Sequence, residues 1–165
     1  MVLEEEGYNV RKDWLGDVPI VLTKMSADGL TSEHVEGFIA DPPKVLDAID
    51  PNMTTRQLPD QDGRKTYQFS VATPMMVSDR TMFITYYPIK DEATGTVTMC
   101  AGSIGNQHFE ESETEAIGSH VVGVIPCSYV RFTPREGGYD VEQASCFDAQ
   151  GWLPGFIQGL GVTAQ

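Results

Sequence analysis

The residue types that most often bind metals are few in this chain and widely separated. The three histidines are His34, His108 and His120, and none has a second histidine or a carboxylate at the spacing of a zinc motif. The glutamates between residues 110 and 115 lack the alternating aspartates and the glycine of a calcium loop, so a solvated face explains them better. The sequence therefore predicts no metal site and no cofactor.

The sequence also contains no motif typical of nucleophilic catalysis. The nearest approach to Gly-x-Ser-x-Gly is Ala101-Gly102-Ser103-Ile104-Gly105, where the first glycine directly precedes the serine and the spacing is wrong. Gly102 is explained more simply as a bend in a curved strand. No glycine-rich phosphate loop precedes a predicted helix. We predict no catalytic residue and expect a binding protein instead of an enzyme.

Composition narrows the class of protein and its partners. The chain has 165 residues, 41% hydrophobic and 21% charged, as expected of one soluble globular domain. No apolar run approaches the roughly 20 residues of a membrane span. The net charge of −13 argues against nucleic acid and against stable docking on anionic membranes, and leaves transient membrane contact open. An acidic start and three scattered cysteines, Cys100, Cys127 and Cys146, favour a reduced, cytoplasmic protein.

The first third of the chain predicts few regular elements. Residues 1–12 are polar and acidic, and we expect a mobile segment ahead of a single domain over 13–165. Residues 18–25 are typical of an edge strand with Pro19 near its start, and 31–40 of a second strand paired with it. A short helix is predicted over 41–49, with Asp41 as its cap.

From residue 54 onward the pattern is strand after strand, separated by turn signals. The predicted strands cover residues 54–58, 66–73, 80–89, 96–104, 119–125, 127–133 and 139–148. Near the end, Trp152, Phe156, Ile157 and Leu160 recur at helical spacing, with Pro154 in the first turn. An antiparallel sheet must bury one face, and this helix is the obvious cover. The predicted fold class is α+β: a curved antiparallel meander of eight or nine strands around a C-terminal helix.

Three stretches resemble the START (StAR-related lipid-transfer) family of the helix-grip, or SRPBCC, superfamily. Asp148-Ala149-Gln150-Gly151-Trp152-Leu153-Pro154 is similar to the Asp-x-x-Gly-Trp-x-Pro sequence that opens the family's last helix. Pro74-Met75-Met76-Val77-Ser78-Asp79-Arg80 and Asp50-Pro51-Asn52-Met53 are similar to two further family segments. The order holds from about residue 35 to the end. The short last segment and the absent opening helix would make this a minimal or truncated member.

The resemblance implies binding, and intracellular transfer, of a hydrophobic ligand such as a sterol, fatty acid or phospholipid in an apolar cavity. Some cholesterol-binding members carry a buried acid–base pair, and Ala48 and Tyr86 stand at those positions here. The expected ligand-binding residues are Met75, Met76, Met82, Ile84, Tyr86, Phe156 and Leu160. The expected structural residues are Arg80, Asp148, Gly151, Trp152 and Pro154.

Two alternatives stay open. A polyketide cyclase or aromatase of the same superfamily would need Tyr86, His120 or Arg131 to converge as acid–base residues in the pocket. A non-catalytic interaction domain would instead fill its cavity with side chains, and such methionine and aromatic positions are commonly plain core. The glycines at 155, 159 and 161 favour this second alternative, because each weakens the terminal helix by about 1 kcal/mol.

Overall fold

The chain forms one large antiparallel sheet with a helix on one face. The computed structural model describes residues 2–5, 8–44, 52–60, 64–73, 77–103 and 118–151, with the backbone alone for 2–5 and 8. The main strands are β1 (Val2–Glu5), β2 (Tyr8–Leu15), β3 (Val18–Asp28), β4 (Met53–Gln57), β5 (Thr66–Val71), β6 (Arg80–Asp91), β7 (Thr96–Ser103), β9 (Ser128–Arg135) and β10 (Gly138–Cys146). No helix in these ranges is long and apolar enough to cross a membrane.

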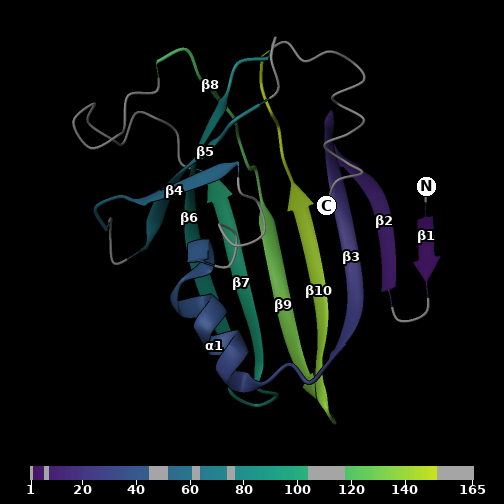
Figure 1. The fold of residues 1–165 in the computed structure, drawn as a ribbon. Coiled ribbons are helices and arrows are strands. Elements are labelled where there is room, and N and C mark those ends of the chain that lie inside the picture. The colour runs from purple at the N-terminus through teal and green to yellow at the C-terminus, as the bar shows by residue number, and fades with distance from the viewer. Residues whose placement is uncertain are drawn as a thin grey trace.

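The strand order is β1-β2-β3-β10-β9-β7-β6-β5-β4, so two antiparallel runs meet where β3 pairs with β10. Figure 1 shows the sheet bending, with β4 and β5 crossing the direction of β9 and β10. The predicted curved antiparallel sheet and the α+β class are therefore confirmed. The prediction that the strands follow one another as a single meander is wrong. Strand β4 does not lie beside β3, the strand before it in the sequence, but at the far edge of the sheet. The terminal helix that we expect the sheet to hold lies outside the described residues.

Residues 31–40 form a helix, and the strand predicted there is wrong. Helix α1 (Ser32–Ala40) begins with a capping box in which the Thr31 hydroxyl accepts from the His34 amide at 3.3 Å. The Thr31 amide in turn donates to Nδ1 of His34 at 3.2 Å. This cap outweighs the β-prone composition, since histidine here takes the role that glutamate or glutamine usually has. The apolar residues Val35, Phe38 and Ile39 then fall on one helical face.

The N-terminal strands differ from the sequence prediction in two ways. Strand β2 crosses the boundary predicted at residue 12, since Val10 lies opposite Thr23 in β3. Strand β3 is an interior strand, paired with β2 on one side and β10 on the other. Pro19 is tolerated because the pairing with β10 ends at Ile20, so only β2 flanks the proline.

The later strands follow the predictions closely, with one exception. The strand predicted over 119–125 is reduced to β8 (Val121–Val122), which pairs in parallel with Arg80 and Thr81 of β6. A separate antiparallel bridge joins Val124 to Asp148. The helix predicted from Asp41 falls mainly outside the described residues.

We call the face of the sheet that carries α1 the inner face. There the ring of Phe38 packs edge-on against Phe132, with the ring centroids 5.7 Å apart, beside buried Val35 and Val141. Opposed residues of paired strands share a face, and alternate residues of a strand do so too. The registers therefore place a second buried cluster on the same inner face, made of Tyr67, Phe69, Met82 and Ile84.

Candidate functional site

The predicted trio Met82, Ile84 and Tyr86 lies side by side on the inner face of β6. Phe69 is opposite Met82, and Tyr67 is opposite Ile84. Met82 is 7% exposed and Ile84 is 5% exposed, so both are packed into the second cluster, whereas Tyr86 is half-buried at its edge. Strand alternation thus brings together three of the predicted ligand-binding residues. Their contact with a ligand stays a prediction.

Tyr86 stands among aromatic rings. Its centroid is 5.8 Å from that of Tyr67 and 6.4 Å from that of Phe69, both in edge-on geometry. Burial, with a smaller contribution from the Tyr67 phenol, raises the pKa of Tyr86 above its ordinary value. The Tyr86 hydroxyl is therefore protonated at any physiological pH and can donate one hydrogen bond to a partner on the inner face.

Arg80 ties the start of β6 to the chain that follows β10. Its side chain is buried, and its guanidinium donates to three backbone carbonyls. Nε donates to the Ala149 carbonyl at 2.8 Å, Nη2 to the Gln150 carbonyl at 3.2 Å, and Nη1 to the Ser78 carbonyl. These contacts to backbone oxygens fit the structural role expected of Arg80, and they fix the direction in which the chain leaves the sheet.

The turn at residues 148–151 is held from a second side. Val124 and Asp148 exchange two backbone hydrogen bonds of 2.8 Å, and the Asp148 carboxylate accepts from the Gln150 amide at 3.0 Å. Gly151 has φ of 67°, a left-handed value that favours glycine. A β-carbon at Gly151 would also lie 3.3 Å from a methyl of Val121. Asp148 and Gly151 thus shape this turn, as expected of structural residues.

The other residues predicted for the site lie outside the described part of the chain: Met75, Met76, Trp152, Pro154, Phe156 and Leu160.

A group of polar residues that the sequence did not reveal also lies on the inner face. We call Thr23, Ser128, Gln143 and Ser145 the polar patch; they come from three adjacent strands, β3, β9 and β10. Residues 143 and 145 alternate with charged or small residues, which is an ordinary surface pattern. The pairing of β10 with β9, which sets Val141 opposite Phe132, identifies this side as the inner one, and the pairing of β3 with β10 adds Thr23 to it.

The three residues named for an enzyme do not converge. Tyr86 is on the inner face of β6, whereas Arg131 is on the outer face of β9, where its guanidinium lies 5.5 Å from the Tyr129 ring. Nδ1 of His120 is 2.9 Å from the hydroxyl of Thr81, an outer-face residue, and Nε2 is 3.7 Å from the Asp79 carboxylate. This trio therefore cannot act together on one substrate.

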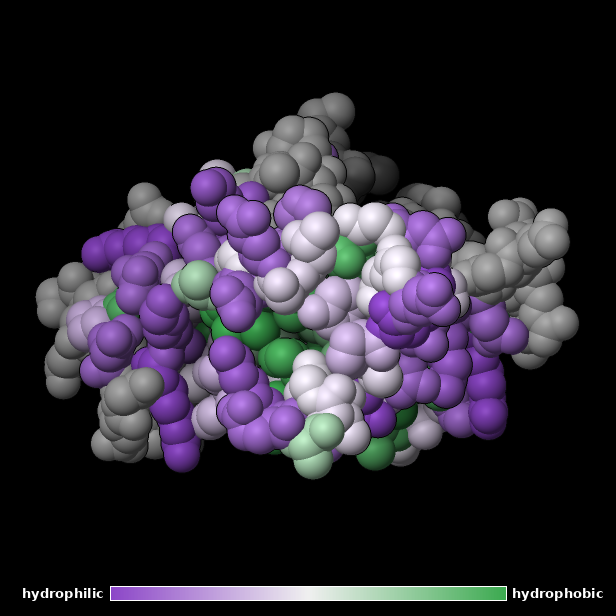
Figure 2. Space-filling view, turned by 90° about the horizontal axis from the view of Figure 1, so that it is seen from below, coloured by the Kyte–Doolittle hydropathy of each residue, from purple (hydrophilic) through white to green (hydrophobic). Residues whose placement is uncertain are grey.

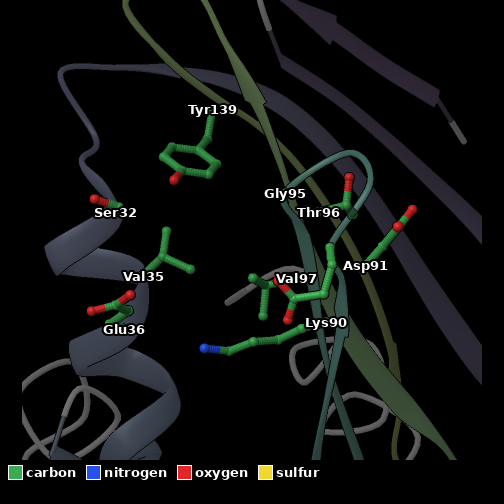
Figure 3. A pocket seen from close by; sticks show the side chains of 10 residues that line it. Ser32, Val35, Glu36, Lys90, Asp91, Gly95, Thr96, Val97 and Tyr139 are labelled. Carbon is green, nitrogen blue, oxygen red and sulfur yellow. The ribbon is translucent and has the colours of Figure 1, made fainter.

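A small pocket opens where α1 begins. It has a volume of about 160 Å³, below the range of about 300–1,000 Å³ usual for ligand pockets. Seen from this end, hydrophobic residues lie in a hollow ringed by hydrophilic ones (Figure 2). The lining includes Val35 and Glu36 of α1 and Lys90 from β6, with Tyr139 opposite (Figure 3). Among the described residues no cluster of histidine, cysteine or carboxylate side chains is arranged to hold a metal ion.

Comparisons with known proteins bear on the fold. No model of a protein family matches the sequence, and no curated protein sequence does. The structure is similar to the lipid transfer and protein localization domain of human StarD13, with a TM-score of 0.72 and 15% identity over 99% of this chain and 82% of that one. It is also similar to human STARD10, with a TM-score of 0.75 and 10% identity over 98% of this chain and 65% of that one. For a StAR-related lipid transfer protein from Xanthomonas axonopodis, the TM-score is 0.69 and the identity 15%, over 98% of this chain and 89% of that one. The predicted likeness is thus confirmed at the level of the fold.

Proposed function

We propose that this chain, which has a START-like fold, binds one hydrophobic molecule against the inner face of its sheet. The observation that carries the proposal is the apolar inner face of β6, where Met82, Ile84 and Tyr86 follow one another, in a fold shared with domains named for lipid transfer. A face of this kind suits a sterol, a fatty acid or a phospholipid tail. We assign no catalytic step to it.

Elementary energetics favour such a ligand. Each methylene group removed from water gains about 0.8 kcal/mol, so area and shape dominate the affinity for a long apolar molecule. A few polar groups then fix its orientation. The Tyr86 hydroxyl suits this role, because it is half-buried and makes no hydrogen bond with another described residue. Removal of that hydroxyl alone should weaken binding without removing the apolar surface.

We also propose transfer of the ligand through the cytoplasm. The three cysteines, Cys100, Cys127 and Cys146, are all unpaired, as expected in a reducing compartment. The net charge of −13 opposes lasting adsorption to anionic membranes, which suits a carrier that touches a membrane and leaves it. Movement of a fluorescent lipid between donor and acceptor vesicles, with and without the protein, tests this part of the proposal.

The binding itself is tested by titration of the protein with fluorescent sterol, fatty acid and phospholipid, and by native mass spectrometry of the purified protein. We expect saturable binding of one molecule per chain. Tyr86→Phe should weaken the preferred lipid about 3- to 10-fold, as the loss of one hydrogen bond implies. The matched control is Tyr87→Phe on the outer face, whose hydroxyl accepts from Arg64 at 3.1 Å and which should bind like the wild type.

Absence of saturable binding for every lipid, together with no co-purified apolar molecule, would overturn the proposal. The alternative of an interaction domain with a filled interior would then be the better explanation. Equal losses in Tyr86→Phe and Tyr87→Phe would instead place the ligand away from the inner face of β6.

A further inference from the structure

Two of the three cysteines lie beside each other where the ladder between β9 and β10 ends. The last pair of that ladder joins Ser128 to Ser145. One further step along each strand reaches Cys127, just before β9, and Cys146, the last residue of β10. Opposed residues of an antiparallel pair have their side chains on the same face of the sheet. The register therefore brings these two thiols together, although 18 residues separate them in the sequence.

The electrostatics of Cys146 agree with this placement. Burial is the largest cause that raises the pKa of the Cys146 thiol. The Cys127 thiol adds to the rise, whereas a hydrogen bond from the Cys127 backbone amide opposes it. Both the side chain and the amide of Cys127 thus act directly on the Cys146 sulfur, as the register implies.

The spacing of neighbouring antiparallel strands suits a disulfide at this place. Opposed residues have their α-carbons about 4.5–5.5 Å apart, the value depending on whether the pair exchanges backbone hydrogen bonds. A disulfide joins α-carbons that are about 4.4–6.8 Å apart. A bond between Cys127 and Cys146 therefore requires rotation of the two side chains and little movement of the backbone.

The two thiols differ in their access to solvent. Cys127 is exposed, whereas Cys146 is only 2% exposed. Oxidants react with an accessible thiolate, and a buried thiol with a raised pKa is inert toward them. An oxidant in solution therefore reaches Cys127 first. Cys146, held against it, is placed to react with the oxidised Cys127 and not with the oxidant itself.

The third cysteine, Cys100 of β7, is an internal control. It lies opposite Tyr87 of β6 on one side and Tyr129 of β9 on the other. Cys127 precedes Tyr129 by two residues, so it is a diagonal neighbour of Cys100. Diagonal neighbours are about 7–8 Å apart, and cysteines whose α-carbons are more than about 7 Å apart cannot be bridged without backbone movement. The geometry thus favours one pair among the three cysteines.

We infer that Cys127 and Cys146 form a reversible redox modification site, which a peroxide oxidises to a disulfide and a small thiol such as glutathione reduces again. The inference does not depend on the proposed function. In a reducing compartment a disulfide of this kind is transient, which agrees with the free state of all three cysteines in the structure.

The chemistry takes place in two steps. The Cys127 thiolate attacks one oxygen of hydrogen peroxide, the O–O bond breaks, and the hydroxide that leaves takes up a proton to become water, while Cys127 becomes a sulfenic acid. The Cys146 sulfur then attacks the Cys127 sulfur and displaces hydroxide, which takes the Cys146 proton as a second water. Two thiols thereby lose two electrons, and the peroxide gains them. Two glutathione thiols reverse the reaction through a mixed disulfide and leave as oxidised glutathione.

The disulfide would strengthen the sheet at the point where the chain leaves it. Just beyond the two cysteines, Val124 and Asp148 exchange two backbone hydrogen bonds of 2.8 Å, which lead into the turn at 148–151. A covalent link between Cys127 and Cys146 limits the separation of the two chains there. Hydrogen exchange at the amides of Val124 and Asp148 should therefore be about 3- to 10-fold slower in the oxidised chain than in the reduced one.

The test treats the full, reduced chain with hydrogen peroxide, alkylates the remaining thiols with iodoacetamide and counts the modified sites by mass spectrometry. The wild type and Cys100→Ser should each lose two alkylation sites, stay monomeric and regain both sites with glutathione. Cys127→Ser, a change at an exposed position, should keep both of its thiols. Cys146→Ser should stop at the sulfenic acid of Cys127, which dimedone traps.

Three results would overturn the inference. The first is a wild-type chain that keeps all three thiols at a peroxide concentration that oxidises free cysteine. The second is a disulfide that includes Cys100, revealed by the loss of two sites in Cys127→Ser or by none lost in Cys100→Ser. The third is hydrogen exchange at Val124 and Asp148 that is equal in the oxidised and reduced chains. None of these results bears on lipid binding, so the proposed function is tested separately.

Discussion

The two ends of the sheet are built differently. At β5 and β6 both faces are buried: Tyr67, Phe69, Met82 and Ile84 on the inner side, and Thr66, Thr81, Phe83 and Thr85 on the outer side. At β3, β10 and β9 the inner face is buried only in part: Phe132 and Val141 are buried, whereas Met25 is 36% exposed. The outer face carries ion pairs such as those of Glu142 with Lys24 and Arg131. Figure 1 shows the two ends joined through β7.

This difference explains which polar residues each end can use. Where both faces are buried, the outer side carries threonines that pair with one another, as the hydroxyls of Thr66 and Thr85 do at 2.8 Å. Where one face meets solvent, charged residues occupy it and alternate with apolar or small residues. Variants in matched pairs, one at each end, test this contrast.

The largest effect is expected at the β5–β6 end. Phe69 is 1% exposed, and its ring lies against Tyr67 and Tyr86, so Phe69→Ala leaves a cavity and should lower the free energy of unfolding by about 3–5 kcal/mol. Urea denaturation of the variant and the wild type measures this change in the free energy of unfolding. Tyr129→Ala on the outer face of β9, where the ring lies beside Arg131, should cost less than about 1 kcal/mol. Similar losses in both variants would contradict the contrast between the two ends.

A smaller loss is expected for Arg80→Met. The substitution keeps an apolar stem but removes the donors that hold the carbonyls of Ala149 and Gln150, so stability should fall by about 2–3 kcal/mol. Arg80→Lys should recover only part of the lost stability, since an ammonium group lacks the planar, several-donor geometry of a guanidinium. Arg131→Met on the exposed face should leave stability unchanged within error. A wild-type unfolding curve for Arg80→Met would show that the turn at 148–151 does not depend on the guanidinium.

The threonine pair gives a finer test. Thr85→Val leaves the buried Thr66 hydroxyl without its partner and should cost about 1–2 kcal/mol. The double variant Thr66→Val with Thr85→Val should recover most of this loss, because no hydroxyl is then left unpaired. Thr133→Val, the same exchange on the outer face of β9 opposite Asp140, is the control and should leave stability nearly unchanged. Additive losses in the double variant would mean that the two hydroxyls do not depend on each other.

The sequence predicted best those elements whose signals are local. Strands β6, β7 and β10 were found within a few residues, because β-branched runs end at clear turns such as that at Asp91–Gly95. Helix α1 was missed because its cap uses His34 in place of the usual glutamate or glutamine. Strand β8 was overestimated, since its length depends on pairing with β6 and not on its own residues.

The candidate site was predictable only in part, for a related reason. Met82, Ile84 and Tyr86 follow from alternation along one strand. The polar patch depends on the register of β3 with β10, which joins residues such as Lys24 and Glu142, 118 positions apart. No local pattern distinguishes Gln143 and Ser145 from surface residues. The pairing of β10 with β9 places them on the inner face, and only the pairing with β3 brings Thr23 beside them.

The smallest expected effect is at Asp79, just before β6. The Thr73 amide donates to its carboxylate at 2.8 Å and, with the Thr73 hydroxyl and His120 adding to the effect, lowers the pKa of Asp79. The ionised form is thus favoured in the folded state. Its contribution to stability is present above the unfolded pKa of about 3.9 and is lost as the pH falls through the lower folded value.

Asp79→Asn should therefore be less stable than the wild type at pH 5–7, and the two should converge as the solution is acidified well below pH 4. Titration of the Asp79 carboxyl carbon by NMR measures the shift directly. Thr73→Val is the informative control: it removes the hydroxyl but keeps the amide, which is the largest cause, so most of the lowered pKa should remain. An ordinary pKa in Thr73→Val would mean that the side chain, and not the backbone, holds this carboxylate at the β6 end of the sheet.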